Sequence, residues 1–433
     1  MPDLILESVR LPGGVGPTDL LIRDGRIFAY GSAVREAASN AERIGGGGRL
    51  LAPAFVEAHL HVEKALLLDR LPGEVRSMGE AIAATAALKR GFTRDDMRAR
   101  AEQLLRMARR HGTLYVRAHV EVDPILGLSA LEVALELRDT LTGLMTVQVV
   151  AFPQEGLQKS PGTEELLREA LRLGADVLGG APYVDPDPIA HLDSLFRLAL
   201  EAGVPLDLHA DFSDDPPPDP PGLTARYVAE RALAEGYVGR VVLGHATALG
   251  ALPPDDVQPI AELLARADVS VVTLPATDLY LGGRTDTHNV RRALAPIQAL
   301  RRAGVNLAYA SNNVRNAFTP FGNADPLEVG LLLLAAGHLA ARSDVEAVFE
   351  MATTNAARAI GLTEYGVAVG NRANLVLLDA TSTWEALVGQ AEKVLVIAGG
   401  RVMVENRRAT VFHEESGVRP VLRYEGRQES GGA

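Results

Sequence analysis

The 433-residue sequence predicts an α/β fold in which a (β/α)₈ barrel carries a small β domain built from both ends of the chain. Between about residues 50 and 360, short β-branched runs alternate with longer amphipathic stretches. After the first unit these repeat at roughly 30 to 35 residues, the length of a strand, a helix and two loops. An open doubly wound sheet is the alternative. No glycine-rich phosphate-binding motif follows the first strand, and this favours the barrel.

Eight apolar or β-branched runs are expected to form the barrel strands. They lie at residues 51–59, 114–118, 146–152, 175–181, 205–208, 240–244, 268–274 and 305–310. The stretches between them are expected to be helices, as in residues 163–174, where leucines recur three and four positions apart. Some of these helices end on a glycine that allows a left-handed cap, such as Gly203 just before the fifth strand.

The chain is expected to divide into a barrel, residues 51–361, and a composite β domain, residues 1–50 together with 362–433. Short alternating runs at both ends are broken by Asp-Gly and Gly-Gly pairs, which are typical of hairpin turns. The glycine run in IGGGGRL (44–50) is expected to be a flexible joint between the domains. The segment DDPPPDPPG (214–222) is too rich in proline for a helix or a central strand, and predicts a stiff loop.

Composition excludes several classes of function. With 43 basic and 55 acidic residues the net charge is −12, which argues against a nucleic-acid partner. The absence of cysteine excludes disulfides, thiolate metal sites and a cysteine nucleophile, so metal ligands would be imidazole or oxygen. No secretory signal is visible, and the longest apolar run, 329–341, is too short to span a membrane. We expect a cytoplasmic protein with a small-molecule partner, and the sequence leaves open whether it forms a homo-oligomer.

Five of the ten histidines lie at the carboxyl ends of predicted strands, where the loops of a barrel converge on one mouth. His59 and His61 are the strongest pair, because residues i and i+2 of an extended segment point to one face and can reach one ion. His209, after the fifth strand, is expected to be a third ligand. His245 is either a ligand or a base beside the site, and His119 either adjoins the ligands or is a packing residue.

Several longer segments extend this pattern in order along the chain. They are APAFVEAHLHVEK (52–64), VRAHVEV (116–122), VVAFPQEG (149–156), LDLHADFSDD (206–215), LGHATAL (243–249), LGGRTDTHNVRR (281–292), SNNVRNAFTPFGNADPL (311–327) and ANLVLLDA near the C-terminus. In these motifs the chain resembles the amidohydrolase superfamily, most closely the cytosine deaminase branch and its triazine-hydrolysing relatives. The resemblance implies a distorted TIM barrel with a β-sandwich domain and one divalent metal ion, zinc or iron, with manganese as a further candidate.

The resemblance also implies roles for individual residues. The positions that match the family's metal ligands are His59, His61 and His209. The positions that match its substrate contacts are Gln154, which would bind an amide edge, Phe318, which would form an aromatic wall, and Asn313. His245 would stand beside the bound water and the substrate.

Two positions depart from the cytosine deaminase pattern. The glutamate that shuttles a proton, three residues after the strand-five histidine, is replaced by Phe212, and the strand-eight aspartate is replaced by Asn312. An amide oxygen can coordinate a cation but is too weakly basic to take a proton. Asn312 is therefore expected to be either a weak neutral metal ligand or a substrate contact, and cytosine itself is not expected to be the substrate.

The remaining proton-transfer candidates are His245 with Asp211, while Glu155 and Glu63 are weaker candidates. Each of these carboxylates has an alternative role, which is to orient a histidine. Lys64 is either a contact for a substrate carboxylate or a solvated loop charge.

The predicted function is hydrolysis of a non-peptide carbon–nitrogen bond in a small cyclic or amide nitrogen compound by metal-activated water. The substrate is expected to be neutral or anionic, with Lys64 or Arg315 as charge partners, because the loss of an anionic ligand at Asn312 leaves the site more positive. The alternative is a barrel that binds a metal or small molecule without catalysis.

Overall fold

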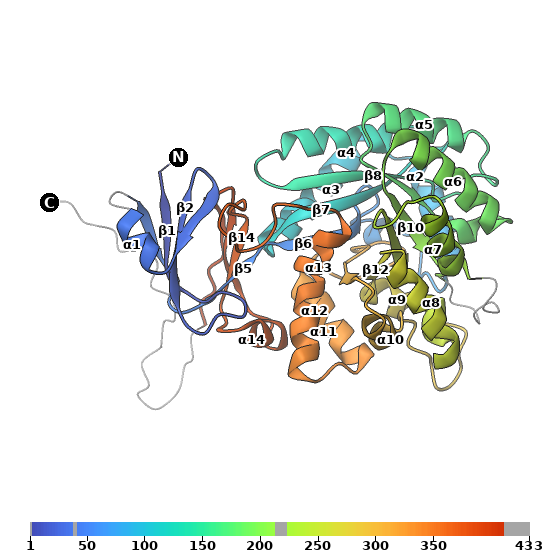
Figure 1. Ribbon diagram of the computed structural model, residues 1–433. Helices are drawn as coiled ribbons and strands as arrows, with labels where there is room; N and C mark the ends of the chain where they lie inside the picture. Colours follow the sequence, from blue (N-terminus) through green and yellow to red (C-terminus); the bar gives the residue numbers. More distant parts are fainter. Residues whose placement is uncertain (1, 38–40, 213–222, 411–433) are drawn as a thin grey trace, which may run out of the picture.

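The computed structural model describes residues 2–37, 41–212 and 223–410 (Figure 1). The proline-rich segment predicted to be a stiff loop, 214–222, lies outside the described residues. Figure 1 shows a barrel wrapped in helices, with two smaller sheets beside it. These sheets contain the blue strands from the start of the chain and the red strands from its end.

Eight parallel strands form the barrel, and each neighbours the next one along the chain. They are β6 (Phe55–His61), β7 (Thr113–Glu121), β8 (Thr146–Phe152), β9 (Val177–Gly180), β10 (Leu206–Ala210), β11 (Val241–His245), β12 (Ser270–Thr273) and β13 (Leu307–Tyr309). The first and last strands meet just past β13, where the His61 amide donates to the carbonyl of Asn312 at 2.8 Å. The Asn312 amide in turn donates to the carbonyl of His59 at 3.1 Å. The predicted (β/α)₈ class is confirmed.

Helices cover the outside of the barrel and extend its loops. They are α2 (Met78–Lys89), α3 (Arg94–Arg110), α4 (Ser129–Thr140), α5 (Thr163–Leu173), α6 (Pro188–Ala202), α7 (Thr224–Ala234), α8 (Pro254–Arg266), α9 (Pro275–Leu281), α10 (Ile297–Arg302), α11 (Pro326–Gly337), α12 (Arg342–Met351) and α13 (Thr354–Ala359). Local sequence explains their ends. The Asp187 side chain caps α6 by accepting from the amides of Ile189 and Ala190. Gly203 ends this helix at a φ of 69°, in the left-handed conformation expected from the sequence.

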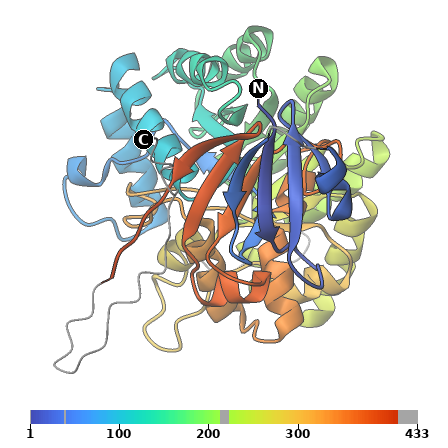
Figure 2. The same cartoon turned by 90° about the vertical axis from the view of Figure 1, so that its left-hand side faces the viewer.

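The terminal domain contains two four-stranded sheets, with the orders β3-β2-β1-β4 and β16-β15-β14-β5. Its elements are β1 (Leu4–Val9), β2 (Thr18–Arg23), β3 (Arg26–Tyr30), α1 (Ser32–Ala37), β4 (Glu42–Gly45), β5 (Leu50–Pro53), β14 (Leu375–Leu378), β15 (Lys393–Ala398) and β16 (Arg401–Glu405). The helix between β14 and β15, α14 (Thr383–Val388), packs on the barrel helices α11 and α12. One buried apolar cluster includes side chains from both sheets, among them Leu6 and Ile397. Figure 2 shows the strands from the two ends of the chain side by side.

The two predicted hairpins have the turns that their sequences require. Asp24 and Gly25 join β2 to β3 with φ values of 50° and 75°, and Gly399 and Gly400 join β15 to β16 with φ values of 54° and 78°. Two successive residues at positive φ define a type I′ turn, whose twist matches that of paired strands.

The structure corrects two expectations at the start of the barrel. The single strand predicted at 51–59 is two strands, because β5 pairs with β14 in the terminal domain and β6 begins the barrel after Ala54. The glycine run is an ordered turn and not a flexible joint. The Gly46 amide donates to Glu7 at 2.6 Å and the Gly48 amide donates to Ser8 at 2.7 Å. The division at residues 50/51 and 361/362 stays a prediction, although β5 places residues 50–53 in a terminal sheet.

A bilayer-spanning helix would have to be both long and strongly apolar, and none of the helices in the described ranges meets both conditions.

The ordered glycine turn gives a stability prediction. A Cβ at Gly46 would lie 2.4 Å from Val9 Cγ1 and 2.9 Å from the Glu7 carbonyl, whereas a Cβ at Gly45 would meet nothing within 4 Å. We expect Gly46→Ala to lower the free energy of unfolding by about 1–3 kcal/mol, the usual cost of overpacking. Gly45→Ala is the matched control and should be close to neutral. Denaturant unfolding of both variants measures the difference, and equal midpoints would show that the turn is not tightly packed.

Candidate metal and active site

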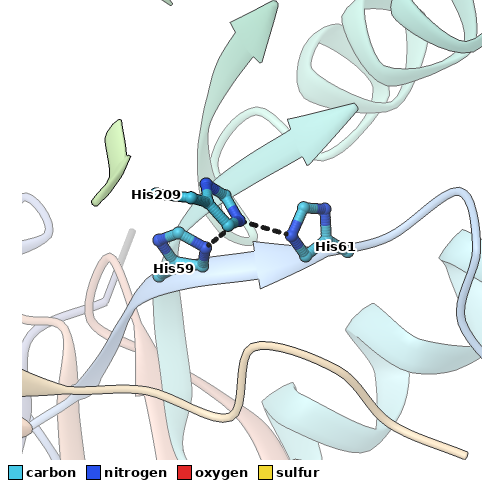
Figure 3. Close-up of side chains that lie close together, drawn as sticks. All are labelled: His59, His61 and His209. Carbon is cyan, nitrogen blue, oxygen red and sulfur yellow. Dashed lines mark hydrogen bonds between the residues drawn. The ribbon is translucent and has the colours of Figure 1, made fainter. Parts of the chain in front are cut away.

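Three histidines from two strands face one another inside the barrel. His59 and His61 are alternate residues of β6, so their side chains lie on one face of the strand, and His209 comes from β10. The Nε2 atom of His209 lies 3.1 Å from the Nε2 atoms of both His59 and His61 (Figure 3). All three residues are buried. The structure therefore brings together the three side chains proposed as metal ligands.

The chemistry of this histidine cluster fits a divalent cation. Burial disfavours the charged imidazole, and it lowers the pKa of His59 to about 3 and the pKa values of His61 and His209 well below the usual range. Neutral imidazoles offer a lone pair to a metal. One ligand atom from each histidine lies within 4.8 Å of those of the other two, so a single ion could reach all three.

A buried aspartate adjoins two of the histidines. Asp207 Oδ1 lies 3.5 Å from His59 Nδ1 and 3.1 Å from His119 Nε2. Arg117 Nη1 donates to the other oxygen, Oδ2, at 2.8 Å. Burial alone would raise the pKa of Asp207, but His119, His59 and Arg117 together lower it, so the carboxylate is ionised. Asp207 therefore lies on the Nδ1 side of His59 and leaves Nε2 for the cluster, an arrangement that is common around metal-binding histidines.

His119 lies beside the proposed ligands, which is one of the two alternatives left open by the sequence. Its ring stacks on that of His59 with the centroids 3.8 Å apart. Sequence reasoning gave Asp207 no role, although a signal was present in LDLHADF. Asp207 precedes His209 by two residues on β10, so both side chains lie on the same face of the strand.

His245, at the end of β11, forms a second histidine–carboxylate pair. Its Nδ1 atom lies 2.6 Å from Asp278 Oδ1, and Asp278 Oδ2 accepts from the Leu274 amide at 3.0 Å. Phe212 stacks on the His245 ring with the centroids 3.8 Å apart and the planes at 11°. The side chain that replaces the family's glutamate therefore covers one face of this imidazole. With Nδ1 bound to Asp278, Nε2 is the nitrogen of His245 that is left for proton transfer.

Asp211 does not have the geometry of a proton carrier, and its predicted catalytic role is corrected here. One carboxylate oxygen accepts from the amide and hydroxyl of Thr224 at 2.8 and 2.7 Å, and the other accepts from the Ala225 amide at 2.9 Å. These groups belong to the first turn of α7, whose free amides need acceptors. Asp211 follows a strand, as a catalytic residue in a barrel would, but its carboxylate is used to hold the start of the next helix.

The two asparagines after β13 lie at the barrel seam. The backbone of Asn312 bonds to both His59 and His61, and its buried Oδ1 has no hydrogen-bond partner among the described residues. This oxygen is available for either of the roles expected of it. Asn313 Oδ1 accepts from Asn316 Nδ2 at 2.7 Å, so the substrate contact proposed for Asn313 stays a prediction.

The loop-charge alternative for Lys64 is wrong, because this residue is only 1% exposed. Its Nζ atom donates to Glu121 Oε1 at 2.8 Å and to Gln154 Oε1 at 3.0 Å, and lies 5.0 Å from the centre of the Phe318 ring. Three residues with predicted substrate contacts, Lys64, Gln154 and Phe318, are thus neighbours. The ring of Phe318 belongs to a buried apolar cluster that also contains Phe212.

The two weaker carboxylate candidates differ in their surroundings. Glu155 Oε1 accepts from Lys89 Nζ at 2.6 Å, so Glu155 takes part in an ion pair. Both carboxylate oxygens of Glu63 are buried and lack hydrogen-bond partners within the part of the chain that the structure describes. Burial raises the pKa of Glu63 to about 7. Among the described residues neither carboxylate forms a hydrogen bond with the histidine cluster, and their catalytic roles stay predictions.

Comparisons with known proteins show the family to which the chain belongs. Residues 78–404 match the amidohydrolase family. The chain is 29% identical to N-isopropylammelide isopropyl amidohydrolase of Pseudomonas sp. (strain ADP), over 93% of this chain and 98% of that protein. It is 30% identical to pterin deaminase of Rhizobium rhizogenes, over 92% of each chain.

Solved structures give the same family. The 5-methylcytosine deaminase of Klebsiella pneumoniae liganded with 5-fluorocytosine superposes with a TM-score of 0.88 at 30% identity, covering 94% of this chain and 99% of that one. The N-isopropylammelide isopropylaminohydrolase of Burkholderia multivorans superposes with a TM-score of 0.82 at 31% identity, with the same coverage. The chain therefore belongs to the amidohydrolase family and is a hydrolase of carbon–nitrogen bonds.

Proposed function

We propose that this chain hydrolyses the bond between a ring carbon and an amino or alkylamino nitrogen of a small nitrogen-containing ring. The buried histidine cluster carries the proposal, because three neutral imidazoles at the mouth of a barrel are a typical metal site of a hydrolase. The relatives' names support the substrate class, since they describe action on an ammelide, a pterin and a methylated cytosine. The non-catalytic alternative is not favoured, because the relatives are enzymes along almost the whole chain.

His59, His61 and His209 would hold one divalent ion, with zinc or iron as the first candidates and manganese as the third. When bound, such an ion lowers the pKa of a coordinated water to about 7 and polarises the bond under attack. Asp207 Oδ1, 3.5 Å from His59 Nδ1, would favour the tautomer of His59 that turns the lone pair of Nε2 to the cluster. Asn312 would add a neutral oxygen from the barrel seam, where its side-chain oxygen is otherwise unused.

His245 would transfer the proton. Asp278 binds its Nδ1, so Nε2 would take a proton from the attacking water and deliver it to the leaving nitrogen. The stacked ring of Phe212 excludes water from one face of this imidazole. In this assignment His245 alone carries out the proton transfers that a glutamate and an aspartate share in cytosine deaminases. For that reason we keep the expectation that cytosine is not the substrate.

The substrate would lie between the histidine cluster and the apolar cluster that contains Phe212 and Phe318. Gln154 would bind its polar edge, with Asn313 as a further contact. An apolar wall with one glutamine suits a flat ring that has a polar edge.

Metal binding should depend on Asp207. We expect Asp207→Asn to weaken zinc binding by about 10–100-fold, the usual effect of removing the partner of a metal-binding histidine. Competition with a chromogenic chelator measures the affinity. Asp185→Asn is the matched control, because Asp185 is also a buried aspartate paired with a histidine, His191 at 2.6 Å, on a different element. If the two variants bind zinc equally well, Asp207 does not orient a ligand.

The activity is tested by screening metal-loaded protein for release of ammonia or amine from aminopyrimidines, aminotriazines and pterins. We expect turnover of at least one ring compound, and we expect His245→Asn to lower kcat by about 10²–10⁴-fold while zinc remains bound. Absence of release from fully metal-loaded protein across the panel would contradict the proposed function. A wild-type kcat in His245→Asn would contradict the role assigned to His245, but it would not contradict the proposed function.

A further inference from the structure

Gln154 can present either end of its amide, and the contact with Lys64 determines which end faces the substrate. An ammonium group only donates hydrogen bonds, so the atom of Gln154 at 3.0 Å from Lys64 Nζ must be the oxygen. The amide nitrogen then points away from the lysine. This Nε2 is buried and makes no hydrogen bond of good geometry among the described residues, and the nearby hydroxyl of Tyr183 can accept only one of its two hydrogens, which leaves at least one hydrogen for a ligand.

Lys64 is itself held in place by a buried network of charges. Glu121 binds Lys64 through Oε1 and Lys89 through Oε2, both at 2.8 Å. Lys89 Nζ also donates to Asp123 and Glu155, each at 2.6 Å. Burial alone would raise the pKa of Glu121, but the two lysines lower it to about 2, so the carboxylate is ionised. Moving Lys64 away would leave the buried carboxylate of Glu121 with only one of its two lysine partners, which would cost folding free energy.

The backbone that carries Gln154 is fixed as well. Asp185 accepts from the amides of Leu157, Gln158 and Lys159, at distances of 2.7 to 3.2 Å. These residues follow Gln154 in the loop after β8. A fixed backbone and a fixed lysine together leave one orientation for the amide group.

We propose that Lys64 is a positioning residue that selects the substrate through Gln154, so that the ring edge facing Gln154 must carry a hydrogen-bond acceptor. A carbonyl oxygen or an unprotonated ring nitrogen meets this condition, and an amino group does not. The inference rests on the proposed function and specifies its substrate class. It also replaces the expected contact between Lys64 and a substrate carboxylate, because Glu121 already balances the charge of this lysine.

The test measures binding and not turnover. We choose 1-methyl-4-pyridone and 4-methylaniline as probes, because the two flat rings have the same shape and differ only in an accepting carbonyl oxygen or a donating amino group. Calorimetry in a His245→Asn background prevents hydrolysis of either ring. We expect zinc-loaded protein to bind the pyridone about tenfold more tightly than the amino ring, the effect of one well-placed hydrogen bond. Equal binding, tighter binding of the amino ring, or no measurable binding of either ring would overturn the inference.

Two variants test the role of the amide itself. Gln154→Glu keeps the shape but replaces the donating nitrogen with an accepting oxygen, so the preference should reverse toward the amino ring. Lys64→Met keeps the apolar stem but frees the amide to turn, so the ratio of the two dissociation constants should fall to near one. A preference that stays at about tenfold in either variant would overturn the inference.

Lys393→Met is the matched control for the loss of a buried lysine. Lys393 is 4% exposed and pairs with Asp325 in a different part of the chain, so this variant should keep the wild-type ratio. If Lys393→Met also loses the preference, the effect of Lys64→Met is a general loss of stability. Zinc content and circular dichroism show whether each variant is folded. The ammonia-release screen tests the proposed function separately, so the two can fail independently.

Discussion

The closure of the barrel between β6 and Asn312, three residues beyond the end of β13, determines the geometry of the site. Two backbone hydrogen bonds join Asn312 to His59 and His61, so the metal-ligand pair lies directly at the seam. Closure also places β10 across the interior, from which His209 reaches both β6 histidines at 3.1 Å. An open sheet would leave the first and last strands at opposite edges and would separate Asn312 from the pair.

Burial at this seam determines the charge of the site. Desolvation keeps the three clustered imidazoles neutral, while three of the nearby carboxylates are each held by specific donors. Asp207 is bound by Arg117, Asp278 by the Leu274 amide, and Glu121 by two lysines. A divalent cation would therefore enter a site of neutral nitrogens bordered by hydrogen-bonded carboxylates. Substrate selection then depends on hydrogen-bond direction at Gln154 more than on net charge.

Much of the fold could be predicted from local patterns. Strand and helix periodicity, together with the Asp-Gly and Gly-Gly turns, indicated the barrel and the hairpins. The break between β5 and β6 could not be predicted, because residues 50–61 form one continuous buried run and only tertiary pairing assigns its first part to β14. The glycine run was misjudged for a similar reason, since its order comes from hydrogen bonds to β1.

For the site, the rule that barrel residues at strand ends converge located all five strand-end histidines. The same rule misassigned Asp211, because the residue after a strand also begins the connection to a helix and can cap it. Asp278 follows the seventh predicted strand, so the same rule places it at the barrel mouth, but its pairing with His245 was not predicted. Lys89 was not predicted, because it lies on a helix and reaches Glu121 from a distant segment. Asp207 could have been predicted from the sequence, because it precedes His209 by two residues on β10 and its side chain therefore lies on the same face of the strand.

The central claim is that one metal ion binds at the histidine cluster. Anomalous X-ray scattering at the zinc edge, from crystals of zinc-loaded protein, tests it most directly. The account predicts one strong peak about 2.1 Å from the Nε2 atoms of His59, His61 and His209. No peak at this position, or a stronger one among Glu121, Asp123 and Glu155 in place of the Lys89 ammonium, would contradict it.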